Sequence, residues 1–483
     1  MSTDNMRLST VKITNVSPIS SAVIAAAARI STQEGDAFTI LKNSIGKGVD
    51  YNSDKNLSLI EKVIGSGHET ILEHVSVTLA FNNVSVFTEQ FFIEHRLISP
   101  TIKSRRYVDF THQGYYIPDE LEGSELEQYV SYMERMFEIY NELLESGVAK
   151  EDARFFLPYS FHSNFYLSCN IRELLHIIKD MLFGKYANNE ELKNLAHQII
   201  DKLDNLQIIP SKILTDIKKT EVSDRNIDED DIRPETSLTY YKRCVSPLSG
   251  DCIVELVGRP SNTSELIRYG NSIIDPYGTP HTTSKIPDRI LEQLNYSFRI
   301  RGISLACLTH FCRHRIQSII IPPLNTIKYN TFIIPPTLSI RNDSNPNAQL
   351  YYERYNEAFN LLLEALKNPI LFKYRQYFAL SGNTIDIMTT MNARELRHFI
   401  ALRTCNRSQW EIQHIASKML FILRREEPNI FNYFGPSCYV NDTCPEGKMC
   451  CGKMDAVKKI FSPNGNYDIN IRRGLIHEYQ SCV

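Results

Sequence analysis

Two spacings of apolar residues recur along the chain, and together they predict an α+β fold. Apolar and polar residues alternate over Val75–Phe81 and Leu294–Ile300, which indicates strands with one buried face, and Val11–Val16 also reads as a strand. The Ala-rich stretch Ser20–Ile30 has the composition and spacing of a helix. Further helices are predicted over Phe87–Arg96, Leu126–Ser146, Leu305–Arg315, Leu350–Lys367 and Ser408–Arg425, with two more that begin near Asn170 and Asn392.

These elements repeat on the scale of a whole domain. Ile71-Leu72-Glu73 recurs as Ile290-Leu291-Glu292, and His95-Arg96 recurs as His314-Arg315, both 219 residues later. Asn170 with Arg172-Glu173-Leu174 recurs as Asn392 with Arg394-Glu395-Leu396, 222 residues later. Chance matches would not keep one order and nearly one register over a hundred residues. The sequence therefore predicts a tandem duplication rather than a solenoid of short repeats.

An acidic stretch separates the two copies. Glu221–Thr236, which reads EVSDRNIDEDDIRPET, has the composition of a solvated linker. We predict a first copy over residues 1–218, an acidic linker over 219–236, and a second copy over 237–483 that ends in a cysteine-rich tail.

The composition excludes several classes of protein. The chain carries 53 Lys and Arg against 56 Asp and Glu, so a strongly basic nucleic-acid coat is excluded and no nucleic-acid polymer is expected as a partner. With 42% apolar and 23% charged residues, the chain is typical of globular proteins rather than disordered ones. No apolar run approaches the roughly 18 residues of a membrane span. The polar segment Met1–Met6 lacks the order of a signal peptide, so we expect a cytoplasmic protein without membrane contact.

The cysteines gather in the second copy, since only Cys169 lies before residue 244. Cys438, Cys444, Cys450 and Cys451 fall within one stretch, GPSCYVNDTCPEGKMCCG. Four such thiols could hold zinc, but their spacing is not the paired C-x-x-C form. We expect reduced thiols in a turn-rich tail, and no metal.

The densest cationic motif is Arg313-His314-Arg315, at the end of a predicted helix. Arginine forks suit phosphate, carboxylate or the polar edge of a planar ring. The alternative is a solvated helix end that complements the helix dipole. The motif alone does not decide between them.

The surrounding residues resemble the signature of the flavin-dependent thymidylate synthases, R-H-R-x-x-S-x-N-x-x-S-x-R-Y. The first copy matches at His95-Arg96, Ser99, Ser104 and Arg106-Tyr107 but has Glu94 and Thr101 at two signature positions, and the second matches at Arg313-His314-Arg315 and Ser318 before diverging. Other segments of both copies also resemble the family. In the first copy they are Gly67-His68-Glu69-Thr70 and Glu151-Asp152-Ala153-Arg154; in the second they are Met391–Leu402, Arg403–Arg407 and Ser408–Ile412.

The resemblance implies two copies of this family's fold, an antiparallel sheet with long helices, and a specific chemistry. Family members use FAD and NADPH to transfer a one-carbon unit from methylenetetrahydrofolate to C5 of dUMP. Arg403 would be the catalytic residue that stabilises charge on the uracil. The nucleotide would be bound by Ser104, Arg106, Arg154, His310, Arg313 and Arg403, although His310 is equally consistent with a plain helix histidine. The flavin would be bound by His68, Thr70, Arg313, His314, Arg315, Asn392, Arg394 and His398.

The two copies have lost complementary parts of this set. The first copy has Glu94 in place of the first signature arginine, and the second has Asn325 and Gln376 where the first has Arg106 and Arg154. The resemblance therefore implies one intact composite site that combines both copies, and a homodimer of tandem chains that reproduces the family's tetramer. Ile102 and Ile321 replace a family glutamate that touches both ligands. Two alternatives stay open: flavin-dependent modification of another uracil nucleotide at C5, or a nucleotide-binding pseudoenzyme.

Overall fold

The computed structural model describes residues 8–18, 20–46, 54–219, 248–249, 252–274, 286–327, 329–338, 346–462 and 465. Apart from Lys219, the predicted linker lies outside these residues. The chain forms two compact units, which are described separately. Unit 1 is built from Met1–Glu138, Leu157–Leu238 and Leu362–Phe378, and unit 2 from Ile139–Phe156, Thr239–Leu361 and Ala379–Val483.

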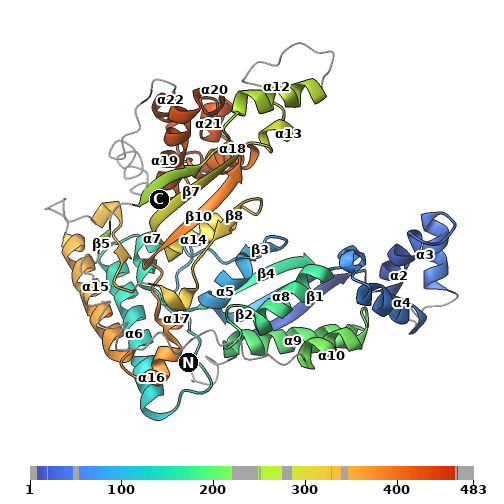
Figure 1. The fold of residues 1–483 in the computed structure, drawn as a ribbon. Coiled ribbons are helices and arrows are strands. Elements are labelled where there is room, and N and C mark those ends of the chain that lie inside the picture. Colours follow the sequence, from blue (N-terminus) through green and yellow to red (C-terminus); the bar gives the residue numbers. More distant parts are fainter. Residues whose placement is uncertain are drawn as a thin grey trace. The chain divides into compact units, whose positions relative to one another are not determined.

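Each unit is organised around one four-stranded antiparallel sheet (Figure 1). In unit 1 the strand order is β1 (Thr10–Ser17), β2 (Ser76–Ser85), β4 (His162–Asn170), β3 (Ser99–Ile102). In unit 2 the order is β6 (Ile253–Gly258), β7 (Asn295–Ser304), β10 (Thr384–Asn392), β8 (Ser318–Ile320). The registers agree as well, because Ser76 pairs with Asn170 and Asn295 with Asn392. The two copies therefore share one sheet topology, and the predicted α+β class is confirmed.

Helices complete both units. In unit 1 they are α2 (Ser21–Ile30), α3 (Ala37–Ile45), α4 (Asp54–Gly65), η1 (Glu69–His74), α5 (Val86–Ile93), α8 (Ile171–Phe183), α9 (Glu190–Leu206), α10 (Ser211–Lys219), α16 (Pro369–Lys373) and α17 (Arg375–Phe378). In unit 2 they are α7 (Lys150–Ala153), α12 (Thr263–Ile274), α13 (Asp288–Leu291), α14 (Leu305–Cys312), α18 (Ala393–Arg403), α19 (Trp410–Glu426), α20 (Pro428–Phe431), α21 (Ser437–Val440) and α22 (Met454–Phe461). The long helices α6 (Gly123–Glu145) and α15 (Pro346–Ala365) contribute residues to both units. Short 3₁₀ turns lie at Arg154–Phe156, Leu324–Thr326, Pro336–Leu338 and Gly447–Met449, and β5 (Leu248–Ser249) pairs in parallel with β9 (Phe332–Ile333). None of the described helices is long and apolar enough to cross a membrane.

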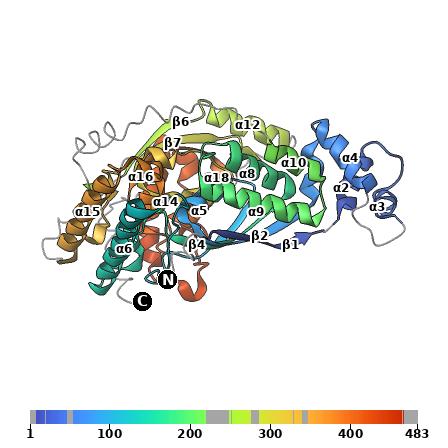
Figure 2. The same ribbon diagram turned by 90° about the horizontal axis from the view of Figure 1, so that it is seen from below.

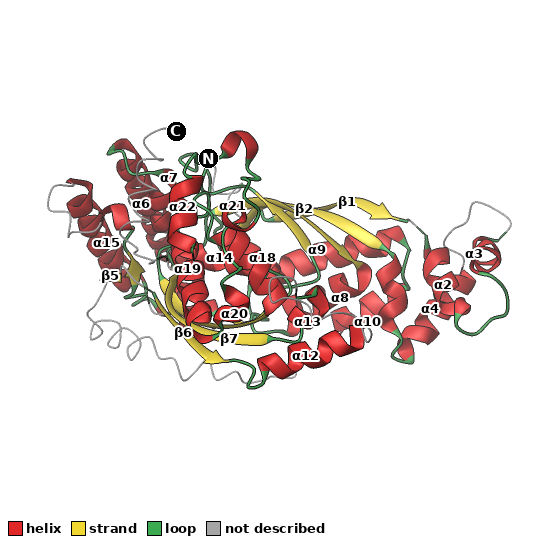
Figure 3. Cartoon of the chain, turned by 90° about the horizontal axis from the view of Figure 1, so that it is seen from above, coloured by secondary structure: helices red, strands yellow, loops and turns green. Residues whose placement is uncertain are grey.

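Two helices of unit 1, α8 and α9, correspond to two helices of unit 2, α18 and α19. α9 packs against the edge strand β1 (Figure 2), and α19 packs against β6 (Figure 3). α8 and α18 each follow the central strand directly, after an asparagine N-cap. Asn170 accepts a hydrogen bond from the Glu173 amide at 2.8 Å, and Asn392 accepts one from the Glu395 amide at 2.8 Å. The repeated sequence Asn-x-Arg-Glu-Leu is therefore a helix-start motif, with the glutamate at the position favoured in capping boxes.

A buried serine–glutamate pair joins strand to helix in each unit. Ser304 caps α14, and both its amide (2.7 Å) and its hydroxyl donate to the carboxyl group of Glu411. In unit 1, Ser85 caps α5 and donates from its amide at 2.7 Å and its hydroxyl at 2.5 Å to Glu191. Both carboxyl groups are about 1% exposed. We call each pair the Ser–Glu clamp, because it ties the end of a central strand to the start of α9 or α19.

The strand before each clamp bends at a bulge. Asn83 and Gly302 occupy corresponding positions and have φ values of 54° and 76°, in the left-handed region. The Asn83 amide donates to the Asn164 side chain, and the Gly302 amide to the Asp386 side chain, each at 2.9 Å. Asparagine tolerates this conformation and glycine adopts it without strain. The same bend in both copies aims the following helix toward its clamp glutamate.

The two copies exchange a segment. Leu362–Phe378, from the second copy, belongs to unit 1, and Ile139–Phe156, from the first copy, belongs to unit 2. In unit 1 the Ser160 amide donates to the Tyr377 carbonyl at 3.2 Å; in unit 2 the Gly382 amide donates to the Phe155 carbonyl at 2.9 Å. These bonds occupy corresponding positions, 222 residues apart, so the exchange is reciprocal. Each compact unit therefore depends on residues from both copies.

We expect the Glu411 clamp to make the stability of the protein depend on pH. Burial raises the pKa of Glu411 to about 7, against the opposing effect of the Ser304 donors. Between the pKa of an exposed glutamate, about 4.5, and about 7, the folded protein binds a proton that the unfolded chain has released, so stability falls as pH rises. The free energy of unfolding of the wild type should fall by a few kcal/mol between about pH 5 and about pH 8 because of this group. Glu411→Gln, which cannot titrate, should not show this fall.

Thermal unfolding midpoints at these two pH values, for the wild type and the variant, measure this difference. Glu127→Gln, which changes an exposed carboxylate on α6, is the matched control and should keep the wild-type pH dependence. If the unfolding midpoints of Glu411→Gln and Glu127→Gln fall by the same amount between the low and the high pH, the clamp carboxyl group does not titrate in this range.

Candidate functional site

The end of α18 places an arginine against a buried histidine. Arg403 Nε lies 2.9 Å from His314 Nε2, and His314 Nδ1 lies 3.1 Å from Glu395 Oε1. A guanidinium only donates, so His314 Nε2 is the acceptor and its Nδ1–H donates to Glu395. Burial lowers the pKa of His314, and Arg403 acts in the same direction while the bond to Glu395 opposes it. His314 is therefore a neutral ring of defined tautomer that orients Arg403.

α14 supplies a second support for the same arginine. Arg403 Nη2 donates to the backbone carbonyl of His310 at 3.4 Å. The Ser304 clamp begins this helix, and His314 follows its last turn. A guanidinium held by an imidazole nitrogen and a carbonyl oxygen presents its plane in one orientation, which is what recognition of a planar polar ring requires.

Arg154 lies near this group, although it comes from the other copy. It is 4% exposed and belongs to the segment that the first copy contributes to unit 2. The charges of Arg154 and Arg403 both oppose the burial that raises the pKa of the Cys307 thiol. Two cationic side chains of unit 2, one from each copy, thus act on the same buried thiol of α14, and their combined charge favours an anion.

The carboxyl groups around Arg154 offset little of its charge. Asp152 accepts hydrogen bonds from Trp410 Nε1 at 2.9 Å and Thr337 Oγ1 at 3.3 Å. Burial is the largest cause that raises the pKa of Asp152 to about 7, as it is for Glu411. At neutral pH each of these two carboxyl groups is therefore protonated in a large fraction of the molecules. Arg154 itself donates from Nε to the Glu151 carbonyl at 3.0 Å.

The other predicted residues of unit 2 have varied surroundings. Arg313 and Arg315 are exposed beyond the end of α14. The exposed His398 ring lies 5.8 Å from the His314 ring. Arg394 pairs with Glu292 and with Asp288 (3.2 Å), and Asn392 caps α18. The structure thus brings His310, Arg313, His314, Arg315, His398 and Arg403 to one end of α14 and α18, while Asn392 and Arg394 have structural partners.

The predicted residues of the first copy, except Arg154, belong to unit 1. His68 and Thr70 are exposed at the start of η1, and Ser104 and Arg106 follow β3 and are half-buried. Glu94, the counterpart of Arg313, pairs with Lys185 at 2.7 Å. Gln376, the counterpart of Arg154, also lies in unit 1. Arg313 and Arg154 therefore both belong to unit 2. Their replacements, Glu94 and Gln376, both belong to unit 1.

Sequence reasoning missed the residues that support Arg403 and Arg154. Glu395 carries a cap-motif signal in the repeat, but nothing in the sequence shows that its side chain reaches His314. Asp152 lies within the Glu-Asp-Ala-Arg segment, and its partner Trp410 lies far along the chain in the best-matching segment. Both are long-range contacts, which spacing alone does not reveal.

The cysteine-rich tail forms a thiol cluster in unit 2. Cys444 and Cys450 share a hydrogen bond, and with the donor amide of Gly452 this bond lowers the pKa of the Cys450 thiol. In the part of the chain that the structure describes, no three or more His, Cys, Asp or Glu side chains are arranged to hold a metal ion.

Comparisons with known proteins agree on one family. The sequence profile described as thymidylate synthase complementing protein matches residues 12–207 and 279–429, two segments consistent with a duplication. The chain is 34% identical over 235 residues to the flavin-dependent thymidylate synthase of Clostridium tetani, which covers 46% of this chain and 89% of the relative. It is 32% identical over 179 residues to the Geobacter sulfurreducens enzyme of the same name, covering 36% of this chain and 74% of the relative.

A solved structure, the UMP/dUMP methylase PolB of Streptomyces cacaoi bound with 5-Br dUMP, is 26% identical and covers 41% of this chain and 92% of that chain, with a TM-score of 0.35. The profile match spans more than half of the chain, in the two segments that the internal repeat marks out. The chain therefore belongs to the thymidylate synthase complementing protein family, the flavin-dependent thymidylate synthases.

Proposed function

We propose that this protein methylates dUMP at C5, with FAD as cofactor and with NADPH and methylenetetrahydrofolate as co-substrates. The proposal rests on family membership and on one observation of the structure. Arg403, oriented by His314, and the buried Arg154 lie near the same thiol, Cys307, in unit 2. A uracil nucleotide has a planar polar ring and a phosphate, and two guanidiniums are the donor set that recognises both.

Arg403 is assigned to the uracil ring. C5 of uracil becomes a nucleophile when negative charge builds up on the ring, and a fixed guanidinium at the ring edge stabilises that charge. His314 contributes by holding the Arg403 plane, and Glu395 contributes by fixing the His314 tautomer. His314 and Glu395 are thus positioning residues, and Arg403 is the residue that would contact the substrate.

Arg154 is assigned to the nucleotide phosphate, and the resemblance adds Ser104, Arg106 and Arg313 to this set. The partly protonated state of Asp152 and Glu411 near neutral pH supports an anion at Arg154. A contribution of Ser104 and Arg106 to this site stays a prediction from the resemblance, as does the pairing of two tandem chains into a dimer.

The residues at the end of α14 fit the requirements of a flavin nucleotide in their chemistry. Arg313 and Arg315 are exposed cations and His398 is exposed beside His314, a donor set that suits an anionic diphosphate. Arg313, His314, Arg315 and His398 would hold FAD, with His68 and Thr70 from unit 1, and Asn392 and Arg394 would act mainly by holding α18 in place. The bound flavin would supply the redox chemistry of the methyl transfer.

A second candidate function is modification of another uracil nucleotide at C5. Its support is that isoleucine stands at both positions, Ile102 and Ile321, where the family has a glutamate that touches both ligands. An isoleucine cannot accept a hydrogen bond, so the selection between uracil nucleotides would differ from that of a typical family member.

The purified chain should carry FAD, about one per chain rather than two, because the resemblance implies that the full set of flavin-binding residues survives only once. The flavin absorbance of the chain measures this ratio. Incubation with dUMP, methylenetetrahydrofolate and NADPH should yield dTMP by mass spectrometry, and a parallel incubation with UMP tests the second candidate. A chain without flavin and without product from either nucleotide would refute both enzymatic functions and leave a nucleotide-binding pseudoenzyme.

Arg403→Lys keeps the charge but loses the planar fork and the bond to His314. We expect kcat to fall about a hundredfold, as for the removal of one preorganised donor at a developing charge. The control is Arg397→Lys on the same helix, where the guanidinium pairs with Asp288 at 2.6 Å in a partly exposed position. Its kcat should change by no more than about twofold. Equal losses in steady-state kcat would show that α18, not Arg403, is what the reaction needs.

Arg154→Ala should raise KM for dUMP by about tenfold to a hundredfold, because a lost charge-assisted phosphate contact costs about 1.5–3 kcal/mol. Gln376→Ala changes the corresponding position of the second copy and should leave KM nearly unchanged. Thermal unfolding of both variants checks that the fold is intact, and Arg154→Lys should restore part of the affinity. Similar KM values for Arg154→Ala and Gln376→Ala would contradict the division of labour between the copies.

A further inference from the structure

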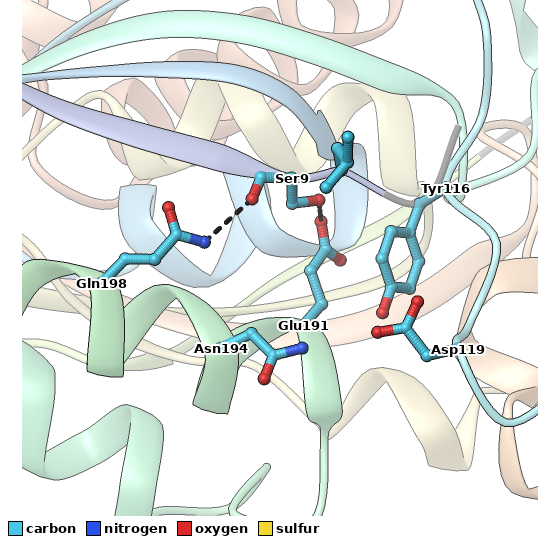
Figure 4. Close-up of a pocket in the computed structure, with 7 residues that line it drawn as sticks. Ser9, Tyr116, Asp119, Glu191, Asn194 and Gln198 are labelled. Atoms are coloured by element: carbon cyan, nitrogen blue, oxygen red, sulfur yellow. Dashed lines mark hydrogen bonds between the residues drawn. The ribbon is translucent and has the colours of Figure 1, made fainter. Parts of the chain in front are cut away.

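Unit 1 contains a pocket of about 530 Å³ that the proposed function does not use. It lies between the start of β1, the loop before α6, and one face of α9 (Figure 4). Its lining residues are Leu8, Ser9, Tyr116, Asp119, Glu191, Asn194 and Gln198. Six of these seven side chains are polar or acidic and none is cationic, so the pocket offers mainly hydrogen-bond acceptors.

Hydrogen bonds within the protein hold two walls of the pocket in place. Gln198 donates from Nε2 to the Ser9 carbonyl at 3.0 Å and accepts from the Val11 amide at 3.3 Å, so its side chain is bonded to the backbone at the start of β1. The Ser9 hydroxyl donates to Glu191 Oε1 at 2.7 Å (Figure 4), and Tyr377 donates to Oε2 at 3.1 Å. The pocket is therefore built on the clamp glutamate of unit 1 and has fixed walls.

Tyr116 stands out among the lining residues. Its side chain is 2% exposed, yet its hydroxyl has no hydrogen-bond partner among the described residues. The residue is fixed at three points: its amide donates to the Ser160 carbonyl at 2.8 Å, its carbonyl accepts from Tyr129 at 2.8 Å, and its ring packs on Tyr377 at 5.2 Å. A buried hydroxyl without a partner is costly, so a group bound in the pocket would satisfy it.

The charges around the Tyr116 hydroxyl are negative. Burial raises the pKa of Tyr116 most, and Glu191, Asp119 and Glu190 raise it further. Burial also raises the pKa of Glu191 itself. Burial is the largest cause that raises the pKa of Glu190; Glu120 and Asp119 raise it further, and Lys193, outside the lining, lowers it. Tyr116 therefore stays a neutral phenol in a negative field, and a positive ligand would be favoured there.

The corresponding place in unit 2 has lost this character. Tyr116 corresponds to Ile333, because the Ile333 amide donates to the Gly382 carbonyl as the Tyr116 amide does to Ser160. The same register aligns Asp119 with Pro336. Lys418 corresponds to Gln198 and donates to the Cys252 carbonyl at 2.8 Å, as Gln198 does to Ser9. The acceptor-rich lining is thus a property of the first copy and not of the shared fold.

We propose that this pocket binds a small organic cation through a primary ammonium group. The ammonium would donate to the Tyr116 hydroxyl oxygen and to the two oxygens of the Asp119 carboxyl group (Figure 4). These three acceptor oxygens match the three N–H donors of one ammonium. The pocket volume has room for a linear diamine and is within the range of small-molecule sites.

Calorimetric titration of the purified full-length chain with putrescine, at constant ionic strength and near neutral pH, tests the proposal. The diol of the same chain length is the uncharged counterpart. We expect saturable binding of putrescine and at least tenfold weaker binding of the diol. Absence of saturable putrescine binding, or equal binding of the diol, would overturn the proposal.

Tyr116→Phe removes only the hydroxyl, and Asp119→Asn removes only the charge. Each should weaken putrescine binding by about tenfold. The matched control is Tyr355→Phe in unit 2, because Tyr355 is 1% exposed and its hydroxyl also has no partner among the described residues, but it lies outside the pocket. Equal affinities for all three variants and the wild type would place the binding elsewhere. The readout does not depend on nucleotide methylation, so it is independent of the proposed function.

Discussion

The Ser–Glu clamp is the interaction on which both units depend. A strand that ends inside the protein leaves backbone amides that need acceptors, and the helix that follows adds its own amides. In each copy, one serine hydroxyl caps the helix while the same serine gives its amide and hydroxyl proton to a buried glutamate. One carboxyl group thereby fixes the end of the central strand, the direction of α5 or α14, and the seat of α9 or α19.

The functional geometry follows from that junction. In unit 2 the clamp starts α14, and the end of α14 carries the His310 carbonyl and His314 that hold Arg403. In unit 1 the corresponding clamp glutamate, Glu191, forms a wall of the acceptor-rich pocket. A substitution at Ser304 or Glu411 would therefore affect the candidate site through helix placement, although neither residue is assigned to a ligand. The cost of keeping a carboxyl group buried is the raised pKa of Glu411.

Much of the fold could be predicted from the sequence, and the reasons for the failures are physical. The alternating stretches predicted β2 and β7, because one face of each strand is buried, and the repeat predicted the helices that follow them. The central strands β4 and β10 were missed, since their threonines, serines and asparagines obscure the alternation and a helix starts at the next residue. The family resemblance identified Arg403 and Arg154 as candidates. The exchange of Leu362–Phe378 and Ile139–Phe156 could not be predicted, because sequence order does not say which sheet a helix packs on.

Reciprocal exchange explains how the copies could diverge. Unit 1 keeps a buried trio in which Arg105 and Ser163 donate to Glu89, and the register places the apolar residues Leu308, Leu324 and Ile385 at the corresponding positions of unit 2. Removing one member of a buried ionic group is costly, whereas replacing all of it by packed apolar residues is nearly neutral.

The exchanged segments have a separate effect. Because Leu362–Phe378 of the second copy belongs to unit 1, an arginine lost from that segment removes a guanidinium from unit 1. Gln376 thus removes a guanidinium from unit 1, whereas Arg154 and Arg403 both belong to unit 2. Under the proposed function, a fused chain can confine nucleotide binding to one unit, and the other unit can then carry side chains, such as Tyr116 and Asp119, that the nucleotide does not need.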